Sequence, residues 1–484
     1  MSERTIGATR GFDLPAAMPW LVAIAVYVLL MALGARLLAD PDTYWHIALG
    51  RLILDQHTLP SSDPFSTTMR GAHWVAYEWL SQVVYTLAYR LGGWTAVAAV
   101  TAGAAAAAFA QLTRYLLQRW QPVPTIIAVL AALSLTAPHI VARPHVLALP
   151  LLVIWIAELI RAVDDDRPPS WRLLPVMTLW ANLHGSFIFG LAMTGLIGAE
   201  AIFRAPAAQR RRAGKAWIAF GVLALAAACI NPYGPQMIVA ALRTLALGPA
   251  LAIIGEWQPQ DFSHLDAYEL IVLAALGFAL LRGVRLPPFR IVMLLGVLYL
   301  SLAQSRHADL LGLLAPLFVA GPLAEQFHAL AADPGASPPA WPTLPLAAGL
   351  VVAALCGGAI GALGNIAPAT NITPAGAVVA LRSERGPIFN SYEFGGYLDF
   401  VGVAPFLDGR TELYGKDFML RYQSAVTLAN LPDFLRLLDD YRIETTLLIP
   451  ATPAVALLDR LPDWRRVYAD ATAVVHTRRH AAQE

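Results

Sequence analysis

The main feature of this sequence is a series of apolar runs, each about 20 residues long, separated by short polar segments. A run of this length can cross a hydrocarbon core of about 30 Å as an α-helix. The first run, residues 18–35, has no charged residue, is too long for the core of a signal peptide and lacks a small-residue cleavage site, so we expect it to be retained. About eleven spans are predicted, at residues 18–38, 93–113, 124–141, 146–162, 172–183, 186–203, 216–230, 267–281, 289–303, 308–324 and 344–363.

Two further apolar stretches, residues 77–93 and 235–255, carry internal polar residues and are predicted to be helices that lie in the membrane interface. With the N-terminus in the cytoplasm, arginine and lysine then gather on the cytoplasmic side, most densely in residues 204–215. This distribution follows the positive-inside rule, whereas counting residues 77–93 as a span would move the basic loop to the other side. The pattern therefore predicts a multi-pass protein of the cell (inner) membrane with an extracytoplasmic C-terminus.

Composition supports the membrane class and argues against several others. Hydrophobic residues make up 57% of the chain and charged residues 14%, whereas an average soluble domain has about 25% charged residues. A net charge of +1 without a basic tract gives no indication of nucleic-acid binding. The sequence contains no Walker-type loop, G-x-S-x-G or H-E-x-x-H motif, so neither a nucleotide-driven pump nor a common hydrolase is indicated.

The last quarter of the chain differs from the rest because it is charged and rich in turn residues. We expect a membrane domain over residues 1–364 and a small extracytoplasmic α/β domain over residues 365–484. Helical patterns occur near residues 416–440 and 452–460. Predicted strands are "GPIFN" (386–390), "GYLDFV" (396–401), "APFLDG" (404–409), "IETTLLIP" (443–450) and "ATAVVHTR" (471–478).

The predicted topology places the polar motifs of the membrane part on its outer face. Ionisable groups near the membrane are functional candidates because their desolvation must be offset. Six separate sites on one face predict an outward-facing polar cavity. The candidates are Asp40, Asp42 and His46 after the first span, Asp63 and Glu78 in the first outer loop, Arg143 and His145, His184, Glu256, and Arg306 with His307.

Each candidate also has a purely structural interpretation. The aspartates could cap the helix that begins near residue 43, and Asp42 with His46 could be a surface pair. Arginine beside histidine, at residues 143–145 and 306–307, could bind lipid headgroups. His184 could satisfy backbone groups at a helix break, and Glu256 beside tryptophan could belong to an interfacial anchor. A functional site is favoured only because all of these candidate residues are predicted to lie on the same face of the membrane part.

A cavity of this composition fits sugar transfer from a lipid phosphate. The reaction needs a carboxylate to orient or deprotonate the acceptor, cations to neutralise the departing phosphate, and a groove that admits a polyprenyl tail. Asp40 or Asp42 could supply the first, and Arg143 and Arg306, with the histidines at 145 and 307, the second. The helical bundle would supply the groove.

These residues resemble a known group of enzymes. The segment "DPDTYWHIALGRLILDQHTLPSSDPFS" (40–66) resembles the first outer loop of oligosaccharyltransferase catalytic subunits and other GT-C glycosyltransferases, in which an acidic motif follows the first span. The segment "HWVAYEWLSQVVYTLAYRLGG" (73–93) is similar to the juxtamembrane helix of protein mannosyltransferases and lipid A aminoarabinose transferases. The resemblance implies a GT-C-like bundle with interfacial helices in the first outer loop.

The resemblance also implies roles for individual residues. Asp40 and Asp42 match the acidic motif at which such enzymes place a catalytic or metal-binding carboxylate, so a divalent cation (Mg or Mn) at these two aspartates is possible under the resemblance. The chain departs from the pattern in lacking the lysine of the aminoarabinose branch, where residues 76–78 read "AYE", and in lacking a WWD-type motif in its C-terminal part. Transfer of a single sugar is therefore expected, rather than transfer of an oligosaccharide to protein.

The sequence thus predicts an inverting glycosyltransferase with a polyprenyl-phosphate sugar donor and an extracytoplasmic acceptor, which could be a glycan, a lipid or a protein. Asp408 and Arg410 of "FLDGRTELYG" (406–415) could contact the acceptor, or could form a local ion pair at the end of a strand. Two other classes stay open. A transporter or flippase of a lipid-linked or anionic solute would need inverted repeats, which the sequence does not display. A non-catalytic membrane assembly protein would use the outer domain to bind a partner.

Overall fold

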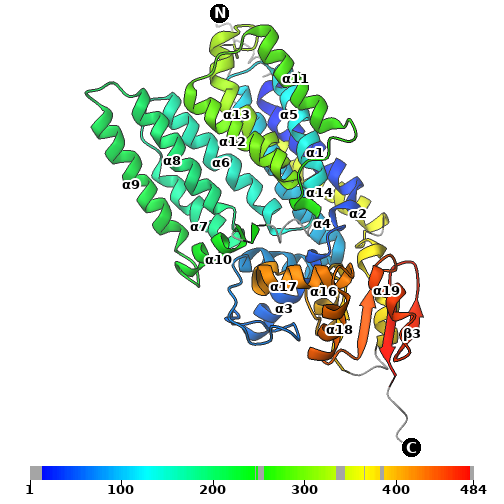
Figure 1. Ribbon diagram of the computed structural model, residues 1–484. Helices are drawn as coiled ribbons and strands as arrows, with labels where there is room; N and C mark the ends of the chain where they lie inside the picture. The colour runs from blue at the N-terminus through cyan, green and yellow to red at the C-terminus, as the bar shows by residue number, and fades with distance from the viewer. Residues whose placement is uncertain are drawn as a thin grey trace, which may run out of the picture.

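The computed structural model describes residues 14–245, 247–248, 255–333, 344–364, 366–381 and 386–479. A helical bundle forms the larger part, and a smaller α/β part lies against one end of it (Figure 1). The helices of the larger part are α1 (Leu14–Ala32), α2 (Gly34–Leu37), α3 (Asp42–Gln56), α4 (Trp79–Leu117), α5 (Pro122–Thr136), α6 (Pro144–Asp164), α7 (Leu174–Leu183), α8 (Phe187–Arg204), α9 (Arg210–Ala228), α10 (Gln236–Leu245), α11 (Ala267–Arg282), α12 (Pro288–Ala303), α13 (Ala308–Gln326) and α14 (Leu344–Leu363).

Several of these helices are suited to a membrane. In the described parts of the chain, six helical segments are long and apolar enough to cross a bilayer, which confirms a helical membrane protein; they are Pro15–Ala32, Trp79–Leu117, Pro122–His139, Pro144–Asp164, Phe187–Arg204 and Ser305–Gln326. Helices also form at the other expected spans, but α7 has only 10 residues and α9 begins with three arginines. The count of about eleven spans therefore stays a prediction.

The chain bends at the predicted boundary between the interfacial helix at residues 77–93 and the second span at residues 93–113. Helix α4 runs through 39 residues, but Gly92 and Gly93 inside it have non-helical backbone angles. Gly93 has φ of 58°, a left-handed conformation that glycine adopts without steric cost. The expected interfacial stretch at 235–255 is represented by the strongly amphipathic α10, and residues 246 and 249–254 lie outside the described residues.

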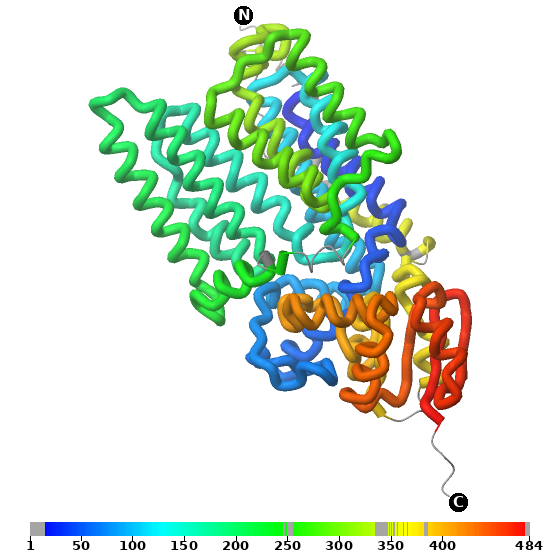
Figure 2. Tube along the Cα trace, viewed as in Figure 1, coloured from blue at the N-terminus to red at the C-terminus, as the bar shows by residue number. Residues whose placement is uncertain are grey.

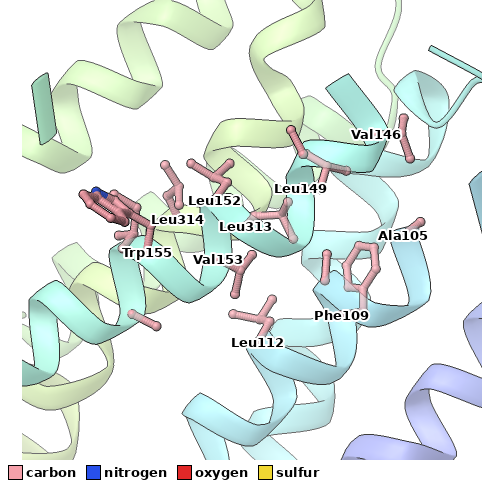
Figure 3. Packing of buried hydrophobic residues seen from close by; sticks show 14 of the residues in the cluster. Ala105, Phe109, Leu112, Val146, Leu149, Leu152, Val153, Trp155, Leu313 and Leu314 are labelled. Carbon is pink, nitrogen blue, oxygen red and sulfur yellow. The ribbon is translucent and has the colours of Figure 1, made fainter. Parts of the chain in front are cut away.

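Apolar side chains of α4, α6 and α13 form the centre of the bundle (Figure 3). Leu112 and Phe109 of α4 lie against Val153 and Leu149 of α6, and Leu313 of α13 packs in the same cluster. All five are buried, so water is excluded from this layer. The central packing holds the N-terminus of α6, where the polar site begins, in a fixed position.

The smaller part is a four-stranded sheet with helices packed against it. Its strand order is β1-β2-β4-β3, in which β1 pairs parallel to β2 and the other pairs are antiparallel. Strand β1 of "GPIFN", β2 of "IETTLLIP" and β4 of "ATAVVHTR" confirm three predicted strands. The elements are β1 (Ile388–Asn390), β2 (Thr445–Leu448), β3 (Trp464–Ala469), β4 (Val474–Arg478), α15 (Ala375–Leu381), α16 (Tyr392–Val401), α17 (Thr411–Val426), α18 (Leu431–Asp440) and α19 (Pro453–Leu458).

Two predicted strands are wrong and one strand was missed. "GYLDFV" lies in α16, where Phe394 and Leu398, spaced four apart, are buried on one helical face. "APFLDG" has no strand and forms the loop that leads into α17. Strand β3 was missed because its burial pattern is mostly exposed, with only Trp464 fully buried. The boundary expected near residue 365 stays a prediction, because residue 365 is outside the described residues.

Candidate functional site: a charged cavity where bundle and outer part meet

A cavity of about 760 Å³ lies at the end of the bundle that contacts the smaller part. Pockets for small molecules and cofactors commonly measure about 300–1,000 Å³. Three short 3₁₀ turns, Ala137–His139, Gly255–Trp257 and Ser305–His307, contribute to it together with the starts of α3, α4, α6 and α17. In Figure 2 the orange segment that contains α16 and α17 lies beside the blue segment that contains α3.

Arg143 connects three carboxylates that come from two distant parts of the sequence. Its Nη1 lies 3.3 Å from Asp40 Oδ2 and 2.7 Å from Glu256 Oε1, and its Nη2 lies 2.9 Å from Asp42 Oδ2. Arg306 Nη1 lies 2.9 Å from the same Glu256 oxygen. All five side chains are at least three-quarters buried. The predicted acids and guanidinium groups are thus brought together at one place.

Local backbone bonds explain why Arg143 is held there. It precedes Pro144, the first residue of α6, and residues before proline favour the extended conformation that Arg143 adopts. The hydroxyl of Tyr85 in α4 donates to the carbonyl of Arg143 over 2.9 Å. Thr43 Oγ1, in α3, donates to the carbonyl of Ala142 over 3.0 Å. The start of α6 is therefore fixed both to α3, which begins in the acidic motif, and to α4.

The acidic motif is also rigid. Asp40 Oδ1 accepts a 2.8 Å hydrogen bond from the backbone N–H of Asp42, so one of its oxygens satisfies the helix start, as the capping interpretation predicted. The other oxygen is left for Arg143. Asp42 and His46 are both buried, which excludes the surface-pair interpretation. Capping and site formation are therefore compatible at this motif.

Burial and the two arginines act in opposite directions on the carboxyl groups. Burial raises the pKa of Asp42 to about 7, although Arg143 opposes this and Asp40 reinforces it. Burial likewise raises the pKa of Asp40. For Glu256 the burial effect is outweighed by Arg143 and Arg306, which together hold its pKa at about 2. Three acids share two guanidinium groups, so an aspartate is the member that protonates most readily while Glu256 stays ionised.

Histidines line another side of the cavity. His184 Nε2 lies 3.3 Å from Glu78 Oε1, and His184 Nδ1 accepts from the backbone N–H of Ser186 over 3.1 Å. The neutral ring therefore carries its proton on Nε2, directed at Glu78. Burial raises the pKa of Glu78 to about 8. His46, His145 and His307 line the same cavity.

The smaller part of the protein closes one side of the site at Gly409. A Cβ atom at this position would overlap Asp42 Oδ1 and lie 2.7 Å from Trp45 Nε1, so only glycine fits. Gly396 of α16 is similarly close, because its Cβ would lie 2.6 Å from the carbonyl oxygen of Pro41. Two glycines thus allow the smaller part to touch the acidic motif directly.

Three predicted site residues lie outside the cavity in a separate buried cluster. Arg410 Nη1 lies 2.7 Å from Asp63 Oδ1, and Arg410 Nη2 lies 2.6 Å from Asp408 Oδ2. None of the three side chains is exposed and none lines the cavity. The local ion pair expected for Asp408 and Arg410 is therefore present, extended by Asp63 from the first outer loop. This cluster joins the two parts of the protein and does not contact the cavity.

The structure adds cavity residues that the sequence analysis did not select. Glu412 lines the cavity and accepts a 2.9 Å hydrogen bond from Trp74 Nε1. Burial raises the pKa of Glu412. The side chain of Trp257 lies against Arg306, with the guanidinium carbon 4.4 Å from the ring centre. Further polar or aromatic residues of the lining include Trp45, Tyr77, His139, Asp309, Tyr392 and Thr411. Glu412 stands in the motif "FLDGRTELYG", which was its one visible signal.

The residues do not form a preformed metal site. Among the described residues, no group of three or more histidine, cysteine, aspartate or glutamate side chains is arranged to hold a metal ion. The two nitrogens of Arg143 instead occupy the space between the carboxylates of Asp40, Asp42 and Glu256. This arrangement does not fit a divalent cation, and we derive no step through one.

Comparisons with known proteins identify the fold. No family model matches the sequence, and a search of curated proteins finds no match. Among solved structures, the apo oligosaccharyltransferase of Archaeoglobus fulgidus matches with a TM-score of 0.51 at 12% identity, covering 91% of this chain and 70% of that one. ArnT from Cupriavidus metallidurans in the apo state matches with a TM-score of 0.49 at 13% identity, covering 95% of this chain and 98% of that one. ArnT bound to undecaprenyl phosphate gives a TM-score of 0.47 at 13% identity, with 94% and 97% covered.

The chain therefore has the fold of a GT-C-like membrane glycosyltransferase, as the first outer loop indicated. At this level of identity the likeness concerns the fold alone. What the cavity does has to be argued from its own residues.

Proposed function

We propose that this protein transfers a sugar from a polyprenyl-phosphate donor to an extracytoplasmic acceptor. The observation that carries the proposal is the ion-pair cluster at the end of the bundle, in which Asp40, Glu256, Arg143 and Arg306 line one cavity. Asp42 joins the cluster through Arg143 but does not line the cavity. Two guanidinium groups suit a phosphate leaving group, and adjacent carboxylates suit proton transfer. The fold supports a lipid-linked donor, as does the undecaprenyl phosphate bound in the matching ArnT structure. A second matching oligosaccharyltransferase structure from Archaeoglobus fulgidus contains a dolichol-phosphate.

The proposed reaction is a single displacement with inversion. The acceptor hydroxyl oxygen attacks C1 of the sugar while the bond from C1 to the phosphate oxygen breaks. The electron pair of that bond leaves with the phosphate, whose charge Arg143 and Arg306 stabilise. The acceptor proton passes to the carboxylate of Asp40 or Asp42. Asp40 lines the cavity, whereas Asp42 does not. Asp40 in turn uses one oxygen for the backbone N–H of residue 42, so the proposal keeps both aspartates as candidates for the base.

The remaining charged residues of the cavity would then position substrates. The Glu78–His184 pair and Glu412 present hydrogen-bonding groups on other sides of the same space. Such groups bind sugar hydroxyls, which both donate and accept. A hydroxyl-rich donor sugar or acceptor fits this lining.

Purified protein in lipid nanodiscs should be tested with a panel of undecaprenyl-phosphate monosaccharides, and with lipid extracts from cells that lack the gene, in which an unused donor accumulates. Asp40→Asn and Asp42→Asn should each reduce transfer, by about 10²–10⁴-fold for whichever is the base. The matched control is Asp417→Asn, an exposed aspartate of α17. Wild-type transfer rates in both well-folded aspartate variants would refute the mechanism.

A further inference from the structure

The carboxylate of Glu256 binds the two arginines that the proposed function assigns to the donor phosphate. Its Oε1 atom lies 2.7 Å from Arg143 Nη1 and 2.9 Å from Arg306 Nη1, so one oxygen bridges the two guanidinium groups. A phosphoryl oxygen that binds two arginines makes the same pair of charge-assisted hydrogen bonds. Glu256 therefore occupies the place of a ligand oxygen in the protein without substrate.

We infer that Glu256 is a built-in competitor of the donor phosphate, which must displace its carboxylate from Arg143 and Arg306 before the sugar can be transferred. This inference rests on the proposed function and adds a control step to it. The ligand class is a phosphate group carried by a lipid. Without the displacement, the phosphate would meet three carboxylates at a site with two cations.

Among the three carboxylates, Glu256 is the one free to move. Asp40 is held by the backbone of residue 42, and Asp42 lies directly against Gly409. The Glu256 side chain is 24% exposed, compared with 14% for Asp40 and 9% for Asp42. It also has the longer side chain, which can rotate without moving the backbone.

The backbone at Glu256 is fixed, so displacement requires only a rotation of its side chain. Ser305 Oγ donates to the carbonyl of Glu256 over 3.1 Å, and Ser305 N donates to the carbonyl of Gln258 over 2.9 Å. Arg306 is also supported by the ring of Trp257. The two cations therefore stay in position when the carboxylate leaves, and the incoming phosphate finds the site already formed.

The consequence is a measurable cost to phosphate binding. When a competent state is only partly populated, the apparent affinity falls by that fraction, and removing the competitor restores it. Glu256→Gln keeps the shape of the side chain and removes its charge. It should bind undecaprenyl phosphate about tenfold more tightly than the wild type, as expected when about 1.4 kcal/mol of competition is removed. Glu325→Gln, at an exposed position near the end of α13, is the matched control and should bind as the wild type does.

The experiment measures undecaprenyl phosphate and inorganic phosphate separately, by native mass spectrometry and by calorimetry, on protein in nanodiscs. Tighter binding of both ligands by Glu256→Gln supports the inference. Tighter binding of the lipid alone overturns it, because the competition is then not for the phosphate. Unchanged or weaker binding by Glu256→Gln also overturns it and leaves the proposed function standing. If the wild type and Glu256→Gln bind no undecaprenyl phosphate at all, the lipid donor and the inference both fail.

Glu256→Asp provides a second test if the glutamine variant does not fold. Aspartate keeps the charge but is shorter by one methylene group, so it cannot bridge both arginines from the same backbone position. We expect its affinity for undecaprenyl phosphate to lie between those of the wild type and Glu256→Gln. An affinity equal to or below that of the wild type contradicts the inference.

Discussion

Two buried groups of charges lie at opposite ends of helix α6, and they have different surroundings. One is the cavity cluster around Arg143, which directly precedes the helix, and the other surrounds Asp164, its last residue. A helix of this length separates them by about 30 Å. At the second cluster Arg290 Nε donates to Glu200 Oε2 over 2.7 Å, and Arg290 Nη2 donates to Asp164 Oδ1 over 2.9 Å.

The second cluster borders no part of the cavity, whereas the first lines it. Arg290 and Glu200 are each 1% exposed, and Arg119 also pairs with Asp164 over 3.1 Å. None of these residues lines the cavity. Cations outnumber acids here, since Arg204 also contacts both carboxylates. Paired charges are thus common to both clusters, and what distinguishes the first is its place at the cavity and its larger number of acids than arginines.

The largest expected effect concerns stability at the closed cluster. Arg290→Met leaves the Glu200 carboxylate buried without its main partner, which should destabilise the protein by about 3–5 kcal/mol. Undecaprenyl phosphate binding by the folded fraction should not change. The measurement is thermal unfolding in nanodiscs beside a binding assay. The double variant Arg290→Met with Glu200→Leu should recover most of the loss, and Arg36→Met at an exposed position is the control. Lost binding without lost stability would show that the two clusters are not distinct.

At the cavity cluster the same type of change should affect catalysis instead. Arg143→Lys keeps the positive charge but cannot contact three carboxylates and a phosphate with one fork. Transfer should fall by about 10³-fold, the upper range for removing one preorganised group that stabilises the transition state. Steady-state kinetics measures this, with Arg36→Lys as the matched control. A rate within a few-fold of the wild type would show that Arg143, like Arg290, is only structural.

The contact between the smaller part and the acidic motif gives a third test. Gly409→Ala places a methyl group against Asp42 Oδ1 and should displace that carboxylate. Transfer should fall by about 10²-fold, as expected for a displacement of about 1 Å at a reacting group. Gly296→Ala is the matched control, because a Cβ there meets no atom within 4 Å. If Gly409→Ala reduces the amount of folded protein but the folded fraction transfers sugar at the wild-type rate, Gly409 does not position Asp42 for the reaction.

The smallest expected effect is a dependence of the transfer rate on pH, which should arise from the cavity cluster around Arg143 and not from the cluster around Asp164. Burial raises the pKa of Asp42 to about 7, and a base must be ionised to accept a proton. With Asp42 as the base, kcat/KM should therefore rise with pH up to about 7 and then level off, falling by about tenfold for each pH unit below that point. The control variant Asp417→Asn should give the same profile. A flat profile between pH 5 and 8 would exclude Asp42 as the base.

The sequence predicted local features well because they depend on neighbouring residues. The helical membrane class follows from apolar runs, and the change of helix at Gly92–Gly93 follows from the glycines themselves. The gathering of Asp40, Asp42, Arg143, Glu256 and Arg306 could be anticipated because the positive-inside rule assigns their loops to one face.

Pairings across long stretches of sequence could not be predicted. Asp63 finds Arg410 from another part of the chain, and Trp74 lies 338 residues from its partner Glu412. The positive-inside rule accounts for the arginines at 119, 204 and 290 only as cytoplasmic charges. In the structure they pair with Asp164 and Glu200. A sequence shows which side chains are charged. The partner that offsets the desolvation cost of a buried charged side chain can be identified only in the folded structure.

The contact at Gly409 has a consequence for how the protein is made. The acidic motif and helices α1 to α13 all precede residue 409 in the chain, so they are synthesised before it. Until the segment around Gly409 has folded against Asp42, the cavity lacks one of its sides. A chain that stopped before residue 409 would hold both arginines and both aspartates without this wall, so the proposed sugar transfer would depend on a contact that forms late.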